Sequence, residues 1–256
     1  MSDQAHFDRL SERFGRNIYD TPKGRIRLHF LQQDLQALLE QDSELLILDA
    51  GGGQGQFARH CASLGHRVVL CDLSEQMLDA ADQLNREQGL EDRIELVRDS
   101  IENFCHHDTR QYQLILCHAV LEWVQESEPL LQALTQRLGN AGRLSLMYYN
   151  RHSIVLRNAL RGNFRKALSD QFGGDGGGLT PTHAREPQQI DSQLQALGMS
   201  IEAQLGVRCF YDYLPPKVRQ TYAFEDILEL EQRFRDQLPY RQMARYIHLI
   251  AAKTQQ

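Results

Sequence analysis

The sequence predicts an α/β fold with a mostly parallel, seven-stranded sheet, helices on both faces and an N-terminal helical cap. Two observations support this class. Between residues 45 and 150, apolar segments alternate with helical segments, and strands that are apolar along their whole length are typical of a parallel sheet covered on both sides. Two more strand-like segments follow residue 150. The chain of 256 residues is long enough for one large core.

The first half of the chain supplies five of the predicted strands. They are ELLILDA (44–50), HRVVLCDLS (66–74), RIELVRDS (93–100), YQLILCHAV (112–120) and GRLSLMYYN (142–150). Three intervening helices are predicted from caps and terminal glycines, at Gln56–Leu64, from Ser74 to about Gln88, and at Glu128–Leu138. Right-handed crossovers would place these helices on the two faces of the sheet.

The second half is less regular. We expect a helix at Ser153–Leu168, a glycine-rich loop at Gly173–Gly178, helices at Pro187–Leu197 and Lys217–Gln237, and strands at 198–210 and 244–253. Five glycines in six positions exclude a stable helix or strand, so the loop is either inert or a lid. Residues 1–44 read as helical, with FLQQDLQALLE (30–40) the clearest amphipathic piece.

Charge and composition exclude several classes of protein. The formal net charge of −6 gives no global positive field toward nucleic acid or membrane, although local patches remain possible. No apolar run approaches the roughly 20 residues of a membrane span. The five cysteines form no C-x-x-C pair and are expected to be free, buried thiols. We therefore expect a cytoplasmic protein without a metal site, and the sequence does not predict its oligomeric state.

The stretch LLILDAGGGQGQF (45–57) is a strand, a glycine turn and the start of a helix. Such a turn at the carboxyl edge of a parallel sheet is typical of a nucleotide-cofactor site. The dinucleotide fingerprint fails, because the sixth position from Gly51 is Gln56. The pattern Asp49-x-Gly51-x-Gly53-x-Gly55 instead resembles the first motif of class I methyltransferases. Their cofactor, S-adenosylmethionine, has no phosphate, so Asp49 is tolerated and can reach its ammonium group.

Further polar residues follow the next strands. Asp72 ends the second strand, about 20 residues beyond the glycines, where a carboxylate would bind ribose hydroxyls. Asp99–Glu102 follow the third strand, where the methyltransferase fold holds adenine. His118 ends the fourth strand at the same edge. The alternatives are a solvated acid, a capped helix N-terminus and a structural histidine, respectively. Together these residues predict a Rossmann-like class I methyltransferase fold.

Other segments resemble one family along nearly the whole chain, the bacterial tRNA 5-carboxymethoxyuridine methyltransferases. The matching segments are FGRNIYDTPKGRIR, LDAGGGQGQ, CDLSEQMLDAA, LCHAVLEWV, LSLMYYNRH, RGNF, LTP, GVRCFYDYL, LELEQRF and PYRQMARYIH. The resemblance implies that S-adenosylmethionine methylates the carboxylate of 5-carboxymethoxyuridine at the tRNA wobble position, forming a methyl ester. One segment departs from it, since the family has basic residues where this chain has QFGGDGGG.

The resemblance also implies cofactor residues. Joined to the glycine turn and strand ends, they give a predicted set of Arg27, Asp49, Gly51, Gly52, Gly53, Asp72, Leu73, Ile101, Glu102 and His118. Arg27 would clamp the methionine carboxylate, although a surface arginine is the alternative. We expect one domain over 1–256, with a cap at 1–44, a cofactor-binding half at 45–150 and a substrate-side half at 151–256.

An acceptor carboxylate needs no general base, because its pKa is about 4 and it is already ionised at neutral pH. Proximity and alignment would drive the transfer, so no catalytic residue is predicted. Candidates for holding the acceptor are Tyr19, Trp123, Tyr149, Asn150, His152, Arg208 and Tyr213. Tyr19 and Trp123 would flank a flipped base, and Arg208 is the favoured carboxylate partner. Packing or surface roles are the alternatives.

The segment RHSIVLRNALRGNFRKALS (151–169) contains no acid. Arg157, Arg161 and Arg165 are spaced by four residues, so on one helix they would share a face that follows tRNA phosphates. A solvated helix face is the alternative. The predicted partner is the anticodon stem-loop of tRNA.

Three other functions compete with this reading. A small-molecule carboxyl or O-methyltransferase would keep the cofactor residues without needing tRNA. A non-catalytic module would bind S-adenosylmethionine or RNA, although the complete motif set argues against it. A nicotinamide oxidoreductase fails on the glycine register.

Overall fold

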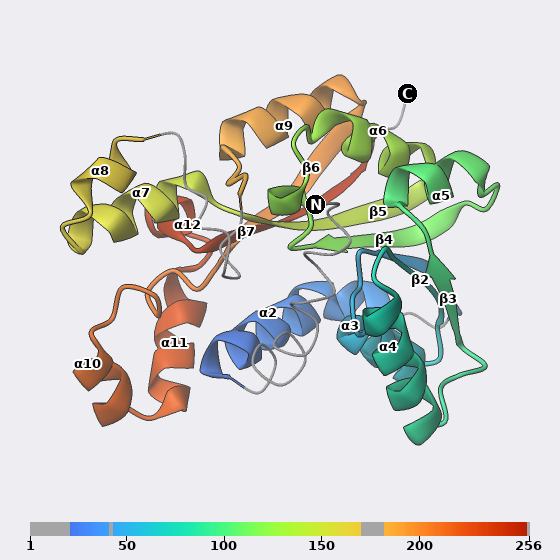
Figure 1. Ribbon diagram of the computed structural model, residues 1–256, viewed down its shortest axis with the longest axis horizontal. Helices are drawn as coiled ribbons and strands as arrows, with labels where there is room; N and C mark the ends of the chain where they lie inside the picture. The colour runs from blue at the N-terminus through green and yellow to red at the C-terminus, as the bar shows by residue number, and fades with distance from the viewer. Residues whose placement is uncertain (1–20, 41–42, 170–181, 255–256) are drawn as a thin grey trace.

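The computed structural model describes residues 21–40, 43–169 and 182–254, which form an α/β structure around one sheet (Figure 1). The strands are β1 Leu46–Ala50, β2 Arg67–Asp72, β3 Ile94–Arg98, β4 Tyr112–His118, β5 Leu138–Tyr149, β6 Met199–Val207 and β7 Tyr246–Lys253. Their order is β3-β2-β1-β4-β5-β7-β6. Neighbours from β3 to β5 are parallel, whereas β7 lies antiparallel between β5 and β6. The predicted mostly parallel seven-stranded sheet is confirmed.

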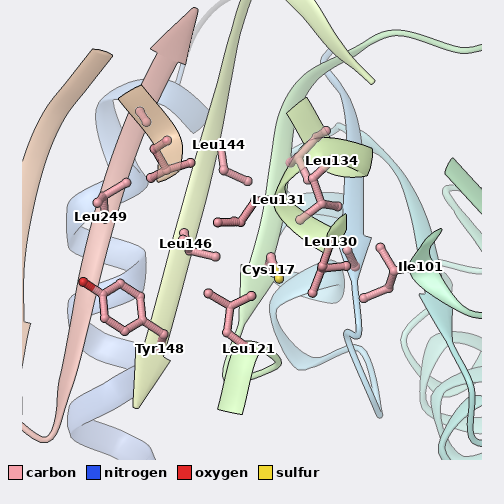
Figure 2. Close-up of a cluster of buried hydrophobic side chains, with 14 of the residues drawn as sticks. Ile101, Cys117, Leu121, Leu130, Leu131, Leu134, Leu144, Leu146, Tyr148 and Leu249 are labelled. Atoms are coloured by element: carbon pink, nitrogen blue, oxygen red, sulfur yellow. The ribbon is translucent and has the colours of Figure 1, made fainter. Parts of the chain in front are cut away.

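Helices cover the sheet on both faces (Figure 1). One layer holds α2 Pro22–Leu39, α3 Gln56–Ser63, α4 Glu75–Glu87 and α11 Phe224–Phe234, and the other holds α5 Ile101–His107, α6 Glu128–Gln136 and α9 Pro187–Ala196. Each layer forms its own hydrophobic cluster with the sheet. Figure 2 shows the cluster beneath α5 and α6. Burial of two such apolar faces is the main stabilising term of the fold.

Side-chain alternation along the strands decides which residues face which layer. Leu144, Leu146 and Tyr148 of β5 belong to the cluster of α6 and α9 (Figure 2). Because successive strand residues point to opposite faces, the intervening Ser145 points toward α2. By the same rule His248 of β7 also points toward α2, because its neighbours Ile247 and Leu249 belong to the cluster of α6 and α9. Polar side chains from different strands are thereby brought together under one helix.

The start of helix α2 is set by a capping residue and a proline. The Thr21 hydroxyl accepts a hydrogen bond from the Gly24 amide at 3.2 Å, and Pro22 occupies the first turn. Its buried face, with Ile26 and Phe30, packs on the sheet. The clearest predicted amphipathic segment is therefore part of the layer that covers the sheet, while residues 1–20, including Tyr19, lie outside the described residues.

Two predicted helices are wrong in extent. The helix predicted at Ser153–Leu168 is two helices, α7 Arg151–Leu160 and α8 Phe164–Ala167, because Gly162 between them adopts a φ of +72°. The helix predicted at Lys217–Gln237 is divided into α10 Pro216–Thr221 and α11, because Ala223 is extended and its amide donates to Asp226. In addition, α6 ends at Gln136 and β5 begins at Leu138, before the predicted start at residue 142.

The remaining elements gather at the carboxyl ends of the parallel strands. They are the 3₁₀ helix η1 Leu121–Trp123 after β4, α7 after β5, α10 after β6, and α12 Tyr240–Met243 before β7. All five cysteines are buried and free, as expected. The predicted glycine loop at 173–178 lies outside the described residues.

Candidate active site

A cavity of about 400 Å³ lies at the carboxyl ends of β1, β2 and β4, beside α2. All ten predicted cofactor residues line it: Arg27, Asp49, Gly51, Gly52, Gly53, Asp72, Leu73, Ile101, Glu102 and His118. The topology explains this, since the strands that precede most of them are parallel neighbours whose ends meet at one edge. The structure thus brings these residues together, and their contact with a cofactor stays a prediction.

The glycine turn between β1 and α3 has no room for a side chain at its first two glycines. At Gly51, with a φ of +74°, a Cβ atom would lie 2.5 Å from Cγ2 of Val120. At Gly52, it would lie 2.6 Å from the carboxyl of Asp49. The turn therefore presents bare backbone on one wall of the cavity.

Asp49 is a buried carboxyl at the base of the cavity. Burial, and then the nearby charge of Asp72, raises the pKa of Asp49 to about 7, against the Ala58 amide and Arg59, which lower it. A carboxyl in this state gains a proton readily when the cavity is empty of cations. A ligand cation placed beside it would favour its ionised form.

Asp72 is fixed in place by backbone amides. Its Oδ2 accepts from the Gly53 amide at 2.8 Å, and its Oδ1 accepts from the Ser74 amide at 2.9 Å. Burial raises its pKa, while these amides lower it. A carboxylate offers about four lone-pair positions, so Asp72 can still accept from a ligand donor such as a ribose hydroxyl.

The N-terminus of α5 forms the neighbouring part of the wall. Ser100 caps this helix by accepting from the Asn103 amide at 3.1 Å, and Asp99 accepts from the Ser100 amide at 2.8 Å. The capped helix terminus, one of the two readings of this segment, is therefore present. Ile101 and Glu102 follow on the cavity wall.

His118 closes the site toward the sheet. Its Nε2 lies 2.8 Å from the Ser145 hydroxyl, and its ring packs edge-on against Phe57. Burial above all, with the positive charge of Arg27 adding to it, holds the pKa of His118 well below its ordinary value, so the imidazole is neutral at neutral pH.

Sequence analysis missed an arginine that positions part of the wall. Arg185 is buried, and its guanidinium donates to the carbonyls of Leu121 at 2.9 Å, Gln125 at 3.2 Å and Val124. It thereby fixes the segment 121–125, which carries Trp123 and Val124 into the cavity. No local pattern could reveal it, because these contacts span about 60 residues of sequence.

The apolar part of the wall was also missed, namely Leu28, Leu31, Phe57, Met77, Val120, Val124 and Leu130. For Leu28 and Leu31 a signal existed, since both lie within one turn of Arg27 on the same helix. The others follow strands or begin helices, where an apolar residue is more often core.

Of the predicted substrate residues that the structure describes, Trp123 alone lines the cavity. Asn150 caps α7 and donates to the carbonyls of Gln242 and Ala244, each at 2.8 Å. The Tyr213 hydroxyl donates to the Met243 carbonyl at 2.6 Å, and His152 pairs with Glu186. These contacts hold α7 against the segment 242–244 before β7 and against the start of α9, so the three side chains have structural partners.

Beyond the cavity lies a group of cations that we call the cationic cluster: Lys23, Arg157, Arg208 and Arg245 around the buried Asp212. Arg208 Nε lies 2.7 Å from Asp212, and Lys23 Nζ lies 3.5 Å from it. Burial would raise the pKa of Asp212, but Arg208, Arg245 and Lys23 together hold it below its ordinary value. Asp212 is therefore ionised, and it compensates one of four positive charges.

Two members of the cationic cluster lack a carboxylate partner within the described part of the chain. The Nε atoms of Arg157 and Arg245 are buried without a hydrogen-bond partner there. Arg245 stacks over Tyr149, with 4.2 Å from its Cζ to the ring centroid, and Arg208 over Tyr246. Lys23 lies one helical turn before Arg27, so the cluster adjoins the cavity. An excess of half-buried positive charge favours an anion at this position.

The predicted arginine face for tRNA is altered by the break at Gly162. Arg157 is half-buried in the cationic cluster, Arg161 follows the last residue of α7, and Arg165 lies on the separate helix α8. A single helix face with all three is therefore wrong, although Arg161 and Arg165 remain exposed.

Comparison with known proteins supports this geometry. Residues 47–142 match a family described as a methyltransferase domain. The chain is 41% identical to the tRNA 5-carboxymethoxyuridine methyltransferase of Escherichia coli (strain K12), over 98% of this chain and 97% of that one. It is 25% identical to the ubiquinone biosynthesis O-methyltransferase of Rickettsia bellii (strain OSU 85-389), over 49% of this chain and 51% of that one. The fold matches magnesium protoporphyrin IX methyltransferase from Synechocystis PCC 6803 with bound SAH, with a TM-score of 0.67, 16% identity and 98% of both chains covered.

The parallel sheet, the glycine turn after β1 and the matched domain define a methyltransferase of the Rossmann-like class. Its particular family follows from the relative that matches along the whole chain. The protein belongs to the family of tRNA 5-carboxymethoxyuridine methyltransferases.

Proposed function

We propose that the protein transfers the methyl group of S-adenosylmethionine to the carboxylate of 5-carboxymethoxyuridine at the wobble position of tRNA, forming a methyl ester. The substrate comes from the family to which the chain belongs. The observation that carries the proposal is the cationic cluster, which adjoins the cavity lined by the ten predicted cofactor residues. An anionic acceptor requires such a cluster, whereas an uncharged hydroxyl acceptor does not.

The cavity fits the proposed cofactor on its own chemistry. The bare backbone at Gly51 and Gly52 lets a ligand approach closely, and Asp72 retains acceptor positions for ribose hydroxyls. Burial raises the pKa of Asp49 to about 7, and the ammonium of the methionine part would favour its ionised form. Arg27 would pair with the carboxylate of the methionine part. The cofactor supplies a methyl group activated by a positively charged sulfur.

The chain's own residues would act by placement. The acceptor carboxylate is ionised at neutral pH, so no side chain has to remove a proton. Arg157 and Arg245, which have no carboxylate partner in the described ranges, would hold the anion beside the cavity. Methylation removes the acceptor's charge, so the ester product loses this attraction and leaves. Trp123 on the cavity wall would stack on the uracil.

The same proposal covers the part of tRNA that is bound and the compartment in which the enzyme works. The anticodon stem-loop is the part of tRNA that carries the wobble nucleotide, so it would be the element that contacts α7 and α8. Such an enzyme would work in the cytoplasm. Within the described residues, no helix is both long and apolar enough to cross a membrane.

The test uses labelled S-adenosylmethionine and tRNA from cells that lack this enzyme. We expect base-labile label on the wobble nucleoside. Label on small organic acids alone would indicate a small-molecule methyltransferase, and tight cofactor binding without transfer would indicate a non-catalytic module.

Arg245→Gln should reduce transfer at subsaturating tRNA while cofactor affinity is retained. Arg233→Gln, on exposed α11 surface, is the matched control. Equal transfer by the two variants would contradict a role for the cationic cluster.

A further inference from the structure

A continuous chain of hydrogen bonds leads from the cavity along the α2 face of the sheet, across β4, β5 and β7, to α2 itself. His118 Nε2 lies 2.8 Å from Ser145 Oγ, and Ser145 Oγ lies 2.8 Å from His248 Nε2. His248 Nδ1 lies 2.6 Å from Asp34 Oδ2. Asp34 is held by both terminal nitrogens of Arg235, at 2.5 and 2.6 Å. Strand alternation explains the arrangement, since these strand residues on β4, β5 and β7 all face α2, which carries Asp34.

The charges at the far end fix the direction of these bonds. Asp34 is ionised, because hydrogen bonds from His248 and Arg235 outweigh its burial and leave its pKa below the ordinary value. The Asp34–Arg235 pair is already neutral. Any charge on His248, which is only 1% exposed, would have to share the single Asp34 carboxylate with Arg235. With the Asp34 charge already matched by Arg235, the arrangement favours one ring proton on His248, carried by the Nδ1 that donates to Asp34.

The remaining directions follow from the number of protons. A neutral imidazole with its proton on Nδ1 has an acceptor at Nε2, so the Ser145 hydroxyl donates to His248. The Ser145 oxygen then accepts, and the donor is Nε2–H of His118. His118 is itself neutral, so its Nδ1 carries a lone pair. No described residue hydrogen-bonds this Nδ1, although the side chain lines the cavity.

We propose that Asp34, His248 and Ser145 fix His118 as the Nε2–H tautomer, so that its Nδ1 faces the cavity as a hydrogen-bond acceptor. The ligand group that it would bind is a donor, such as an ammonium or hydroxyl group. These three are positioning residues, because they act through His118. The order Ser–His–Asp resembles a hydrolase triad, but Ser145 is 0% exposed and no substrate reaches it.

The tautomer can be measured without any ligand. In the ¹⁵N-labelled, ligand-free chain, a long-range ¹H–¹⁵N correlation spectrum at pH 7.5 distinguishes protonated from unprotonated ring nitrogens. We expect His118 to show a protonated Nε2 and an unprotonated Nδ1. Its signals are identified by their loss in His118→Gln and by through-space contact with Phe57, whose ring centroid lies 5.6 Å away. A protonated Nδ1 in the unaltered protein would overturn the proposal.

Variants test whether the chain of bonds causes the tautomer. Ser145→Ala should allow both His118 tautomers and weaken S-adenosylmethionine binding roughly two- to tenfold, as expected for one hydrogen bond. Ser145→Thr keeps the hydroxyl and should restore the single tautomer. Ser192→Ala, on the exposed face of α9, is the matched control. An unchanged tautomer in Ser145→Ala would contradict the proposal. The nature of the ligand rests on the proposed function, whereas the spectrum of the ligand-free chain does not, so the two can fail separately.

Discussion

Asp72 combines a structural and a binding task in one carboxylate. Its two oxygens accept from the amides of Gly53 and Ser74, which ties the glycine turn to the start of α4. We predict that Asp72→Ala weakens S-adenosylmethionine binding by roughly ten- to a hundredfold, because hydrogen bonds to a charged group contribute about 1.5–3 kcal/mol. Isothermal titration calorimetry measures the change. Asp79→Ala on the exposed face of the same helix should be neutral. Unchanged affinity in Asp72→Ala would exclude it from the site.

Asp49 should link cofactor binding to pH. Its pKa is raised to about 7 by burial and then by Asp72, so near neutrality part of the population is protonated. A bound cation favours the ionised form. Binding at pH 6 to 7 should therefore release protons, and affinity should rise as pH increases through about 7. Calorimetry in two buffers of different ionisation enthalpy measures the release. It should disappear in Asp49→Asn; if it persists, another group, with Glu122 the next candidate, is responsible.

At the scale of elements, α7 and α8 should provide sequence-independent attraction for tRNA. Arg161 and Arg165 are exposed near the break at Gly162, in a segment without acids. If each neutralises one phosphate, Arg161→Ala/Arg165→Ala should lower the slope of log affinity against log salt by about 1.4 to 1.8, since each contact contributes about 0.7 to 0.9. Filter binding across a salt series measures the slope. Arg86→Ala on α4 is the control, and an equal slope in all three proteins would place the tRNA elsewhere.

The elements also show what sequence could and could not predict. The strands were readable because most are continuous apolar segments separated by helical ones. The helix breaks were not, because Gly162 lies within a helix-like pattern and Ala223 is an ordinary helix former. Of the site, the strand-end acids and glycines were predictable, since parallel topology brings them together. Arg185 and the pair Asp34–His248 were not, because their contacts span about 60 and 214 residues of sequence.

At the scale of the whole molecule, a sheet covered by two hydrophobic clusters leaves little room for an uncompensated charge. Glu122 is nevertheless only 1% exposed, and its Oε2 has no hydrogen-bond partner within the described ranges. Burial raises its pKa to about 7 from an ordinary value of 4.5, against Arg27 and Arg185, which lower it. A raised carboxyl pKa contributes stability that is complete below pH 4.5. This contribution is lost as pH rises through about 7, because the folded state must then hold a buried charge.

Glu122→Gln removes the ionisable group and keeps its shape. We predict that the variant matches the unaltered protein at pH 5 and exceeds its free energy of unfolding at pH 8 by on the order of 1 kcal/mol, a cautious fraction of the 1.36 kcal/mol per pKa unit. Urea unfolding at both pH values measures the difference. Glu128→Gln, exposed at the start of α6, should show no such pH dependence. If Glu122→Gln is destabilised equally at both pH values, the carboxylate acts as a fixed partner of Arg27 and Arg185, and its pKa is low.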